Sequence, residues 1–102
     1  MELIKTQTRS SQFGINDKQL VSQCIAIEIA NQSDDDRSPD TGESIGYRLI
    51  INNGRTLLPG QSWSISMPFG YIDDTMYNVT FKAVSGTPSN SQAQGCVTRT
   101  TI

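Results

Sequence analysis

Apolar and polar residues alternate with a period of two along several short stretches of the chain. The clearest stretch is 21–31, VSQCIAIEIAN, in which Ile25, Ile27 and Ile29 fall on one side of an extended backbone. Successive side chains of a strand point to opposite faces, so this alternation of β-branched residues predicts a half-buried strand. We expect the three isoleucines to lie in the core.

Turn signals separate the other alternating stretches. Asn53-Gly54 fits the two-residue turn of a hairpin, and Pro59-Gly60 fits a type II turn with a positive φ at its glycine. Because these turns are close together, we expect residues 47–67 to form a meander of three neighbouring strands. The strands of the meander cover residues 47–51, 55–58 and 61–67, and two further strands are predicted at 76–85 and 96–102.

The pattern predicts a single all-β domain. A chain of 102 residues suits one domain, and about six to eight short antiparallel strands favour a small β-sandwich or a jelly-roll-like barrel. Residues 1–8 alternate loosely and are predicted to form an edge strand or an arm. Residues 9–19 are rich in turn formers and are predicted to be a loop. Residues 31–46, NQSDDDRSPDTGESIG, are predicted to form a long acidic polar loop.

Neutral polar residues dominate the composition. Ser, Thr, Asn and Gln make up 36 of the 102 residues, whereas 35% are apolar and 18% are charged. This is typical of a β-rich surface with many turns, because disordered chains carry more net charge and fewer β-branched and aromatic residues. The net charge is −2 and no basic run is present, and no apolar stretch approaches the roughly 20 residues of a membrane span. We therefore expect neither nucleic acid nor a membrane as a partner.

The first residues, MELIKTQTRSSQF, lack the apolar segment and the cleavage pattern of a signal peptide. We expect the protein to act in the cell that makes it, or to leave by a route that needs no signal peptide. Assembly into a virus particle that is released by lysis is one such route.

Catalytic residue sets are hard to assemble from this chain. It has no histidine, which removes the commonest general base and every Ser-His-Asp or Cys-His arrangement. A carboxylate pair such as Asp73 and Asp74 would suffice for a glycosidase, but carboxylates in polar loops are usually solvated. The sequence favours a protein that is not an enzyme and that carries no cofactor.

The acidic loop carries oxygen ligands of the kind that calcium prefers. Aligned with an EF-hand loop from Asp34, it has Pro39 where that motif needs glycine and Ile45 where it needs glutamate. We therefore favour a solvated loop over a calcium site. The candidate calcium ligands would be Asp34, Asp36, Asp40 and Glu43.

Cys24 and Cys96 lie in the first clear strand and in the last one. They could share one sheet or face each other across a sandwich. Without an export signal, free buried thiols are favoured, and a disulfide formed after release is the alternative.

Three aromatic residues, Trp63, Tyr71 and Tyr77, are candidates for a sugar-stacking platform. Trp63 and Tyr77 fall on the apolar sides of predicted strands, so core packing is favoured for both. Loop 68–75, PFGYIDDT, is the better candidate for a contact surface. Its candidate partner-contact residues are Phe69, Tyr71, Asp73 and Asp74.

The stretch 47–65, YRLIINNGRTLLPGQSWSI, resembles an element of small phage structural proteins. In that element a strand and a short hairpin lead into the next strand through Leu-x-Pro-Gly-(Gln/Glu)-Ser-(aromatic)-Ser. The upstream segment CIAIEIANQS resembles the strand that often precedes it, so the likeness covers about 24–65, less than half of the chain. The acidic insertion at 34–43 is longer than the pattern usually carries. The matching residues are Leu57, Pro59, Gly60, Gln61, Ser62, Trp63 and Ser64, with Leu58 at the free position.

The resemblance implies a virion protein that is made in the host cytoplasm, with no catalytic residues to carry over. Its implied role is that of a capsid decoration (auxiliary) protein, a homo-oligomer or present in many copies, that stabilises the particle by docking on neighbouring subunits. A head-fibre, vertex or tail component is one alternative, and a glycan- or receptor-binding module is another. Other virion proteins are the expected partners, and the expected contact segments are residues 1–8, 34–46 and 68–75.

Overall fold

The computed structural model describes residues 5–52 and 54–102, and this part of the chain forms strands and no helix. All paired strands are antiparallel. The strands are β1 (Gln7–Gly14), β2 (Gln19–Val21), β3 (Ala26–Asn31), β4 (Arg48–Ile51), β5 (Arg55–Leu57), β6 (Ser62–Ser66), β7 (Met76–Lys82) and β8 (Gln94–Thr101).

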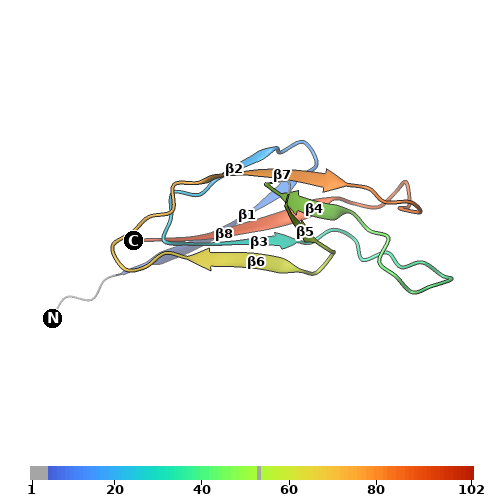
Figure 1. Ribbon diagram of the computed structural model, residues 1–102, viewed down its shortest axis with the longest axis horizontal. Coiled ribbons are helices and arrows are strands. Elements are labelled where there is room, and N and C mark those ends of the chain that lie inside the picture. Colours follow the sequence, from blue (N-terminus) through green and yellow to red (C-terminus); the bar gives the residue numbers. More distant parts are fainter. Residues whose placement is uncertain (1–4, 53) are drawn as a thin grey trace.

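The strands form two four-stranded sheets that face each other (Figure 1). One sheet has the order β1-β8-β3-β6, and the other has the order β2-β7-β4-β5. The first four strands therefore pair with the last four in reverse order, and every connection except β4–β5 crosses between the sheets. This is the topology of a jelly roll. The predicted all-β sandwich is confirmed, with two sheets that stay separate and do not close into a barrel.

The core lies between the sheets and follows the predicted alternation. Ile27 and Ile29 of β3 are buried, and Ile25, which precedes that strand, is half-buried. In β7, every second residue from Tyr77 to Phe81 is buried. The buried apolar residues are Phe13, Leu20, Cys24, Ile27, Ile29, Leu49, Ile51, Leu57, Tyr77, Val79, Phe81 and Val97.

Strand β1 corrects the prediction of a loop at 9–19. It pairs with β8 over its whole length, but only one of its residues, Phe13, is buried. No apolar alternation therefore marks this strand in the sequence. Backbone pairing with β8 holds it, together with side-chain hydrogen bonds such as the one of 2.8 Å between the hydroxyls of Ser10 and Thr98. Residues 1–8 were predicted to form an edge strand or an arm. Residues 7 and 8 belong to β1, which lies at the edge of its sheet, and residues 1–4 lie outside the described part of the chain.

The stretch 21–31 is not one strand, as its alternation predicted. It contains the end of β2, a crossing between the sheets and then β3. Cys24 and Ile27 are both buried although they are three positions apart, so the alternation changes phase between them. Gln23 has a φ of 48°, which turns the backbone from one sheet toward the other. The core position predicted for the isoleucines is confirmed for Ile27 and Ile29.

The predicted meander over 47–67 is wrong in its last step. Strands β4 and β5 form a hairpin, but β6 pairs with β3 in the other sheet. The type II turn is confirmed, because Gly60 has a φ of 88° and the Gln61 N–H donates to the Leu58 carbonyl at 2.9 Å. That turn carries the chain across the sandwich instead of along one sheet. The other predicted turn contains Asn53, which lies outside the described residues.

The molecule is a rod with extents of 59 × 22 × 20 Å. At one end, the terminal pole, β2, β6 and β8 end, β1, β3 and β7 begin, and the C-terminus lies (Figure 1). The opposite end, the loop pole, is formed by the connections 32–47 and 83–93. Because the strands run along the rod, most connections between the sheets gather at these two poles.

Gly95 of β8 lies opposite Phe13 of β1, whose ring fills the space beside the glycine. A side chain at position 95 would collide with that ring, so we expect Gly95→Ala to lower the free energy of unfolding by about 1–3 kcal/mol. Gly14→Ala is the matched control, because open space surrounds Gly14. Urea unfolding measures both variants, and equal midpoints for the two would contradict this packing.

Candidate functional site

Buried polar side chains lie at both poles, where the chain crosses between the sheets. At the loop pole, Asn31 at the end of β3 is fully buried. Its amide nitrogen donates to the carbonyls of Tyr47 and Leu57, each at 2.8 Å. Its amide oxygen accepts from the Ser33 N–H at 3.0 Å. The Asn31 side chain therefore joins the connection between β3 and β4 to the connection between β5 and β6.

At the terminal pole, Asp73 joins two other crossings. Its carboxylate accepts hydrogen bonds of 2.7 Å from the hydroxyls of Ser22, Thr75 and Tyr77. Its backbone pairs with that of Cys24. This network, the Asp73 network, links the connection between β2 and β3 with the connection between β6 and β7.

The Asp73 carboxylate is ionised at all but strongly acidic pH. Burial by itself raises its pKa, but the hydrogen bonds from Thr75, Ser22 and Tyr77 outweigh burial and lower the pKa to about 2. Burial, together with the hydrogen bond to Asp73 and its charge, raises the pKa of Tyr77 to about 12. Neither group of this pair titrates near neutral pH, as a general acid or base needs to do.

This placement corrects one of the predicted contact residues. Asp73 is only 7% exposed, so its carboxylate stabilises the fold and does not face a partner. Asp74, the next residue, is exposed. A carboxylate in a polar loop looks solvated in the sequence, and only the strand pairing shows that Ser22 and Tyr77 surround this one.

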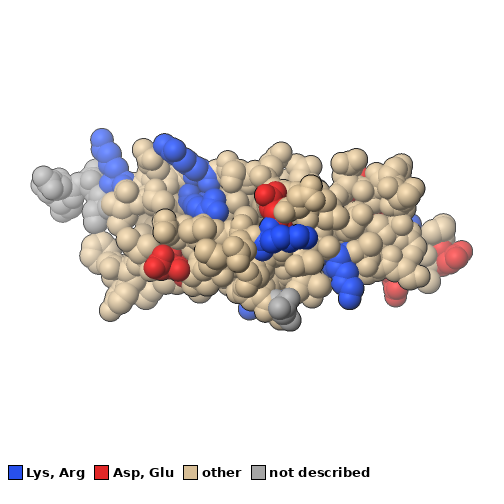
Figure 2. Space-filling view, turned by 90° about the horizontal axis from the view of Figure 1, so that it is seen from above, with Lys and Arg blue, Asp and Glu red and all other residues tan. Residues whose placement is uncertain are grey.

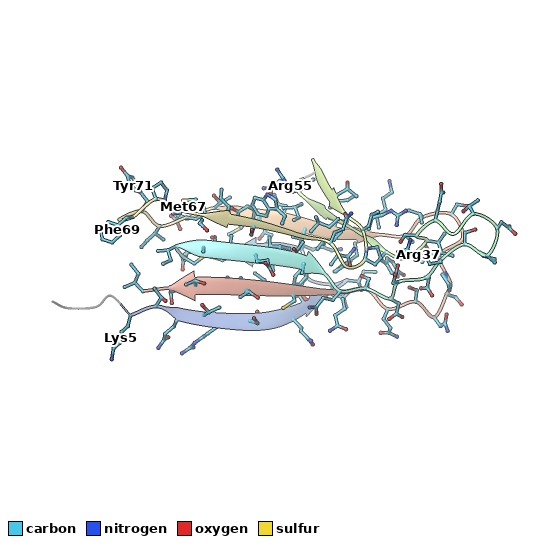
Figure 3. The ribbon with its side chains drawn as sticks, turned by 90° about the horizontal axis from the view of Figure 1, so that it is seen from below. Lys5, Arg37, Arg55, Met67, Phe69 and Tyr71 are labelled. Atoms are coloured by element: carbon cyan, nitrogen blue, oxygen red, sulfur yellow. The ribbon has the colours of Figure 1, made fainter. Side chains whose placement is uncertain are left out.

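Exposed apolar side chains gather at the terminal pole. In the loop between β6 and β7, Phe69 is 85% exposed, and Tyr71 and Ile72 are each 66% exposed. Figure 3 shows Phe69 and Tyr71 at the tip of this loop and Met67 where the loop leaves β6. The exposed apolar residues of this pole, the apolar patch, are Val21, Ile65, Phe69, Tyr71, Ile72, Met76 and Ile102.

The apolar patch confirms the exposure predicted for Phe69 and Tyr71. Among the large apolar side chains exposed in the described part of the chain, only Ile15 lies away from the patch. Exposed apolar side chains gathered at one end of a molecule commonly mark a contact site. The sequence did not predict that Val21 and Met76 belong to the patch, because they are distant in the chain and meet only as cross-strand partners of β2 and β7.

The acidic loop at 34–43 does not gather its carboxylates around a common point. Asp34 accepts from the Gln92 N–H at 2.9 Å, and Asp36 accepts from the Ser91 hydroxyl at 2.7 Å. These bonds tie the loop to the segment before β8. Within residues 5–52 and 54–102, no three Asp, Glu or Cys side chains lie close enough to hold a metal ion. The structure therefore does not bring together the candidate calcium ligands Asp34, Asp36, Asp40 and Glu43.

The two cysteines are free and lie too far apart for a disulfide bond. Cys24 is buried before the start of β3, whereas Cys96 in β8 is half-buried opposite Ala30, near the end of β3. The extended chain from Cys24 to Ala30 spans about 20 Å, and a disulfide needs Cα atoms within about 7 Å. This separation does not fit the alternative prediction of a bridge within the chain. Both thiols are free, Cys24 buried and Cys96 half-buried.

A cleft of about 700 Å³ opens between the β4–β5 hairpin and β6. Trp63 and Tyr77 form its apolar wall, with ring centroids 5.4 Å apart in an edge-to-face contact. The guanidinium of Arg55 lies over the Trp63 ring at 5.1 Å from its centroid, so a cation occupies a face on which a sugar would stack. Tyr77 lies in the core as predicted, Trp63 packs half-buried against it, and Tyr71 lies at the terminal pole. The three aromatic residues therefore form no common platform.

Comparisons of this chain with protein-family models, with curated proteins and with solved structures find no match. The part of the chain that the structure describes has no helix of the length and apolarity needed to cross a membrane. The functional interpretation therefore rests on the geometry of the chain itself. That geometry combines a jelly roll, polar networks at its crossings and an apolar patch at one pole.

Replacing Asp73 by Asn tests the Asp73 network. The pKa of this carboxyl is about 2 in the folded chain, against an ordinary value of 3.8. The ionised carboxylate therefore stabilises the folded chain fully at pH values above 3.8. This stabilisation is lost as the pH falls from 3.8 toward about 2. We expect Asp73→Asn to lower the free energy of unfolding at neutral pH by about 1–3 kcal/mol. The variant should also lose less stability than the parent chain across that acidic range.

Asp74→Asn is the matched control, because it removes the same charge from an exposed neighbour. Urea unfolding, followed from neutral to strongly acidic pH, measures both variants. Equal stability of the two at neutral pH would show that the Asp73 carboxylate does not join the crossings.

Proposed function

We propose that this protein is a non-enzymatic structural component of a virus particle, namely a capsid decoration protein that docks on neighbouring subunits and stabilises the shell. The observation that carries the proposal is the apolar patch, in which Phe69, Tyr71 and Ile72 are largely exposed. An apolar surface of this kind is costly to leave in water. A permanent partner surface would remove that cost.

The fold and the sequence support the same role. Jelly rolls occur in viral capsid proteins and in lectins. Because one fold serves many functions, the surface of the molecule, and not its fold, favours one of these two roles. The stretch 24–65 resembles small phage structural proteins. A lectin-like role is less favoured, because Arg55 covers Trp63 in the cleft between the β4–β5 hairpin and β6. The apolar patch mixes aliphatic and aromatic side chains, as the centres of protein interfaces do.

Docking through the apolar patch suits the shape of the molecule. The patch lies at one end of a rod 59 Å long, so a docked copy would contact the shell end-on. The Asp73 network fixes the base of the loop that carries Phe69 and Tyr71, which reduces the entropy that is lost on binding. Each contact buries a modest area, and the symmetry of a shell multiplies it.

A head-fibre, vertex or tail component would use the same patch, because such a protein also attaches one end of an elongated subunit to a particle. Copy number distinguishes these roles. A decoration protein is present in numbers comparable with those of the shell subunits, whereas a vertex or tail component is present in few copies.

Substitution of two exposed aromatic residues tests the docking role. We expect Phe69→Ser/Tyr71→Ser to weaken binding to particles stripped of accessory proteins by at least about tenfold, because aromatic anchors commonly dominate an interface. Ile15→Ser is the matched control, since Ile15 is exposed and apolar but lies outside the patch. Co-sedimentation measures the binding, and size-exclusion chromatography with light scattering verifies that both variants stay folded.

Binding of the parent chain at a fixed stoichiometry, lost in the double variant and kept in the control, is the expected result. A folded chain that does not bind the particles at all would contradict the proposal, and so would binding that the double substitution leaves unchanged. A glycan array would then test the receptor-binding alternative.

A further inference from the structure

A second surface of the terminal pole carries positive charge. Arg9 of β1 and Arg99 of β8 are directly opposite in the strand register. They share a face with Phe13 and Val97, which are buried farther along the same strands, so both arginines lie on the inner side of their sheet. They line a cleft of about 500 Å³ together with Gln7, Ser10, Ser11 and Thr101.

The cleft exists because the facing sheet is shorter at this end. Strand β1 has 8 residues and β2 has 3, so the first half of β1 has no strand across from it. Arg99 reaches over the gap, and its Nε donates to the carbonyl of Val21, the last residue of β2, at 2.7 Å. This bond orients the guanidinium and uses one of its five N–H donors.

The two guanidinium groups of the cleft repel each other. Side chains directly opposite in an antiparallel pair have Cβ atoms about 5 Å apart, and like charges there destabilise the pair. In the described part of the chain, the one ion pair within 4.0 Å joins Arg37 to Asp35 at the loop pole. No carboxylate of the described residues therefore forms an ion pair with Arg9 or Arg99, and an anion held between them would turn the repulsion into attraction.

More positive charge lies nearby. Figure 2 shows Lys and Arg side chains toward the terminal pole, with an acidic group also at that end, and acidic side chains at the far end of the loop pole. Figure 3 places Lys5 at the same pole as Phe69 and Tyr71. The apolar patch and the arginine pair thus belong to one end of the rod, and one partner can cover both.

We propose that the Arg9–Arg99 cleft binds the carboxylate side chains of an acidic segment on the protein to which the apolar patch docks. The identity of that partner as a virion protein rests on the proposed function. Guanidinium groups bind carboxylates through paired, charge-assisted hydrogen bonds, and the hydroxyls of Ser11 and Thr101 add donors beside them. The interface then has an apolar centre and a charged site at its rim, which fixes the orientation of the docked rod.

Other sources of negative charge fit this surface less well. A nucleic acid needs a row of cations along its backbone, whereas this cleft presents two arginines on one strand pair. An anionic membrane attracts surfaces through clustered positive charge, and the chain as a whole has a net charge of −2. A short acidic protein segment matches both the size of the cleft and its position beside the apolar patch.

Titration of the ¹⁵N-labelled full chain with a hexaglutamate peptide tests the cleft directly, at about 20 mM salt where screening is weak. We expect saturable shifts of the amide signals of residues 7–11 and 98–101. Binding should weaken about tenfold in Arg9→Gln, which removes one charge-assisted contact. Arg55→Gln is the matched control, since it removes the same charge from a guanidinium that lies over Trp63. Arg9 is exposed, and the amide spectrum verifies that its variant stays folded.

Shifts that do not saturate, or equal weakening in the two variants, would overturn the proposal. Tighter binding of inorganic phosphate than of hexaglutamate would also overturn it, because the cleft would then select a phosphate group. Binding to phosphatidylglycerol vesicles that exceeds peptide binding and is lost in Arg9→Gln would assign the cleft to a membrane instead.

The particle assay separates this proposal from the docking role. Particle binding that is unchanged in Arg9→Gln would contradict the cleft proposal alone. Hexaglutamate binding by a chain that ignores stripped particles would contradict the docking role, while the cleft would remain a carboxylate site.

Discussion

The structure depends on buried hydrogen bonds at the points where the chain passes from one sheet to the other. Six of the seven connections between consecutive strands change sheets. At each such crossing, backbone N–H and C=O groups lose the hydrogen-bond partners that a neighbouring strand would provide. Buried polar groups without partners are costly, so each crossing needs hydrogen bonds of another kind. Asn31 supplies them at the loop pole, and Asp73 does so at the terminal pole. Apolar packing draws the sheets together, but these two side chains decide where the crossings meet.

The sequence predicted what local alternation can encode. The strands with a buried inner face, such as β3, β4 and β7, were predicted because their apolar side chains recur every second position. Strand β1 was missed because only Phe13 of it is buried, and β6 was assigned to the wrong neighbour because a turn specifies a reversal but not the sheet that receives the next strand. The exposure of Phe69 and Tyr71 was predictable from their loop. The burial of Asp73 and the pairing of Arg9 with Arg99 were not, because long-range strand register creates both.

The two poles differ in chemistry, and that difference shapes the functional account. At the loop pole, Asp34 and Asp36 are occupied by hydrogen bonds to the segment before β8, and the acidic loop is part of the fold. At the terminal pole, the apolar patch is exposed, and the Arg9–Arg99 pair, which forms no ion pair with any described carboxylate, lies at the same end. The Asp73 network lies directly behind the patch, so the residue that completes the fold also fixes the surface proposed for docking. The proposed docking uses this end of the rod.

Native-state hydrogen exchange tests most directly whether the polar networks hold the crossings as firmly as the ladders hold the strands. The informative amides are those of Ser22, Ser33 and Asp73, which donate to the Thr75 carbonyl at 3.1 Å, the Asn31 side chain at 3.0 Å and the Cys24 carbonyl at 2.8 Å. We expect all three to exchange within about tenfold of the amides of β3, and the amides of Phe69 and Ile72 to exchange far faster. Exchange of the three crossing amides as fast as that of Phe69 and Ile72 would contradict the claim that the networks hold the sandwich and its apolar patch in place.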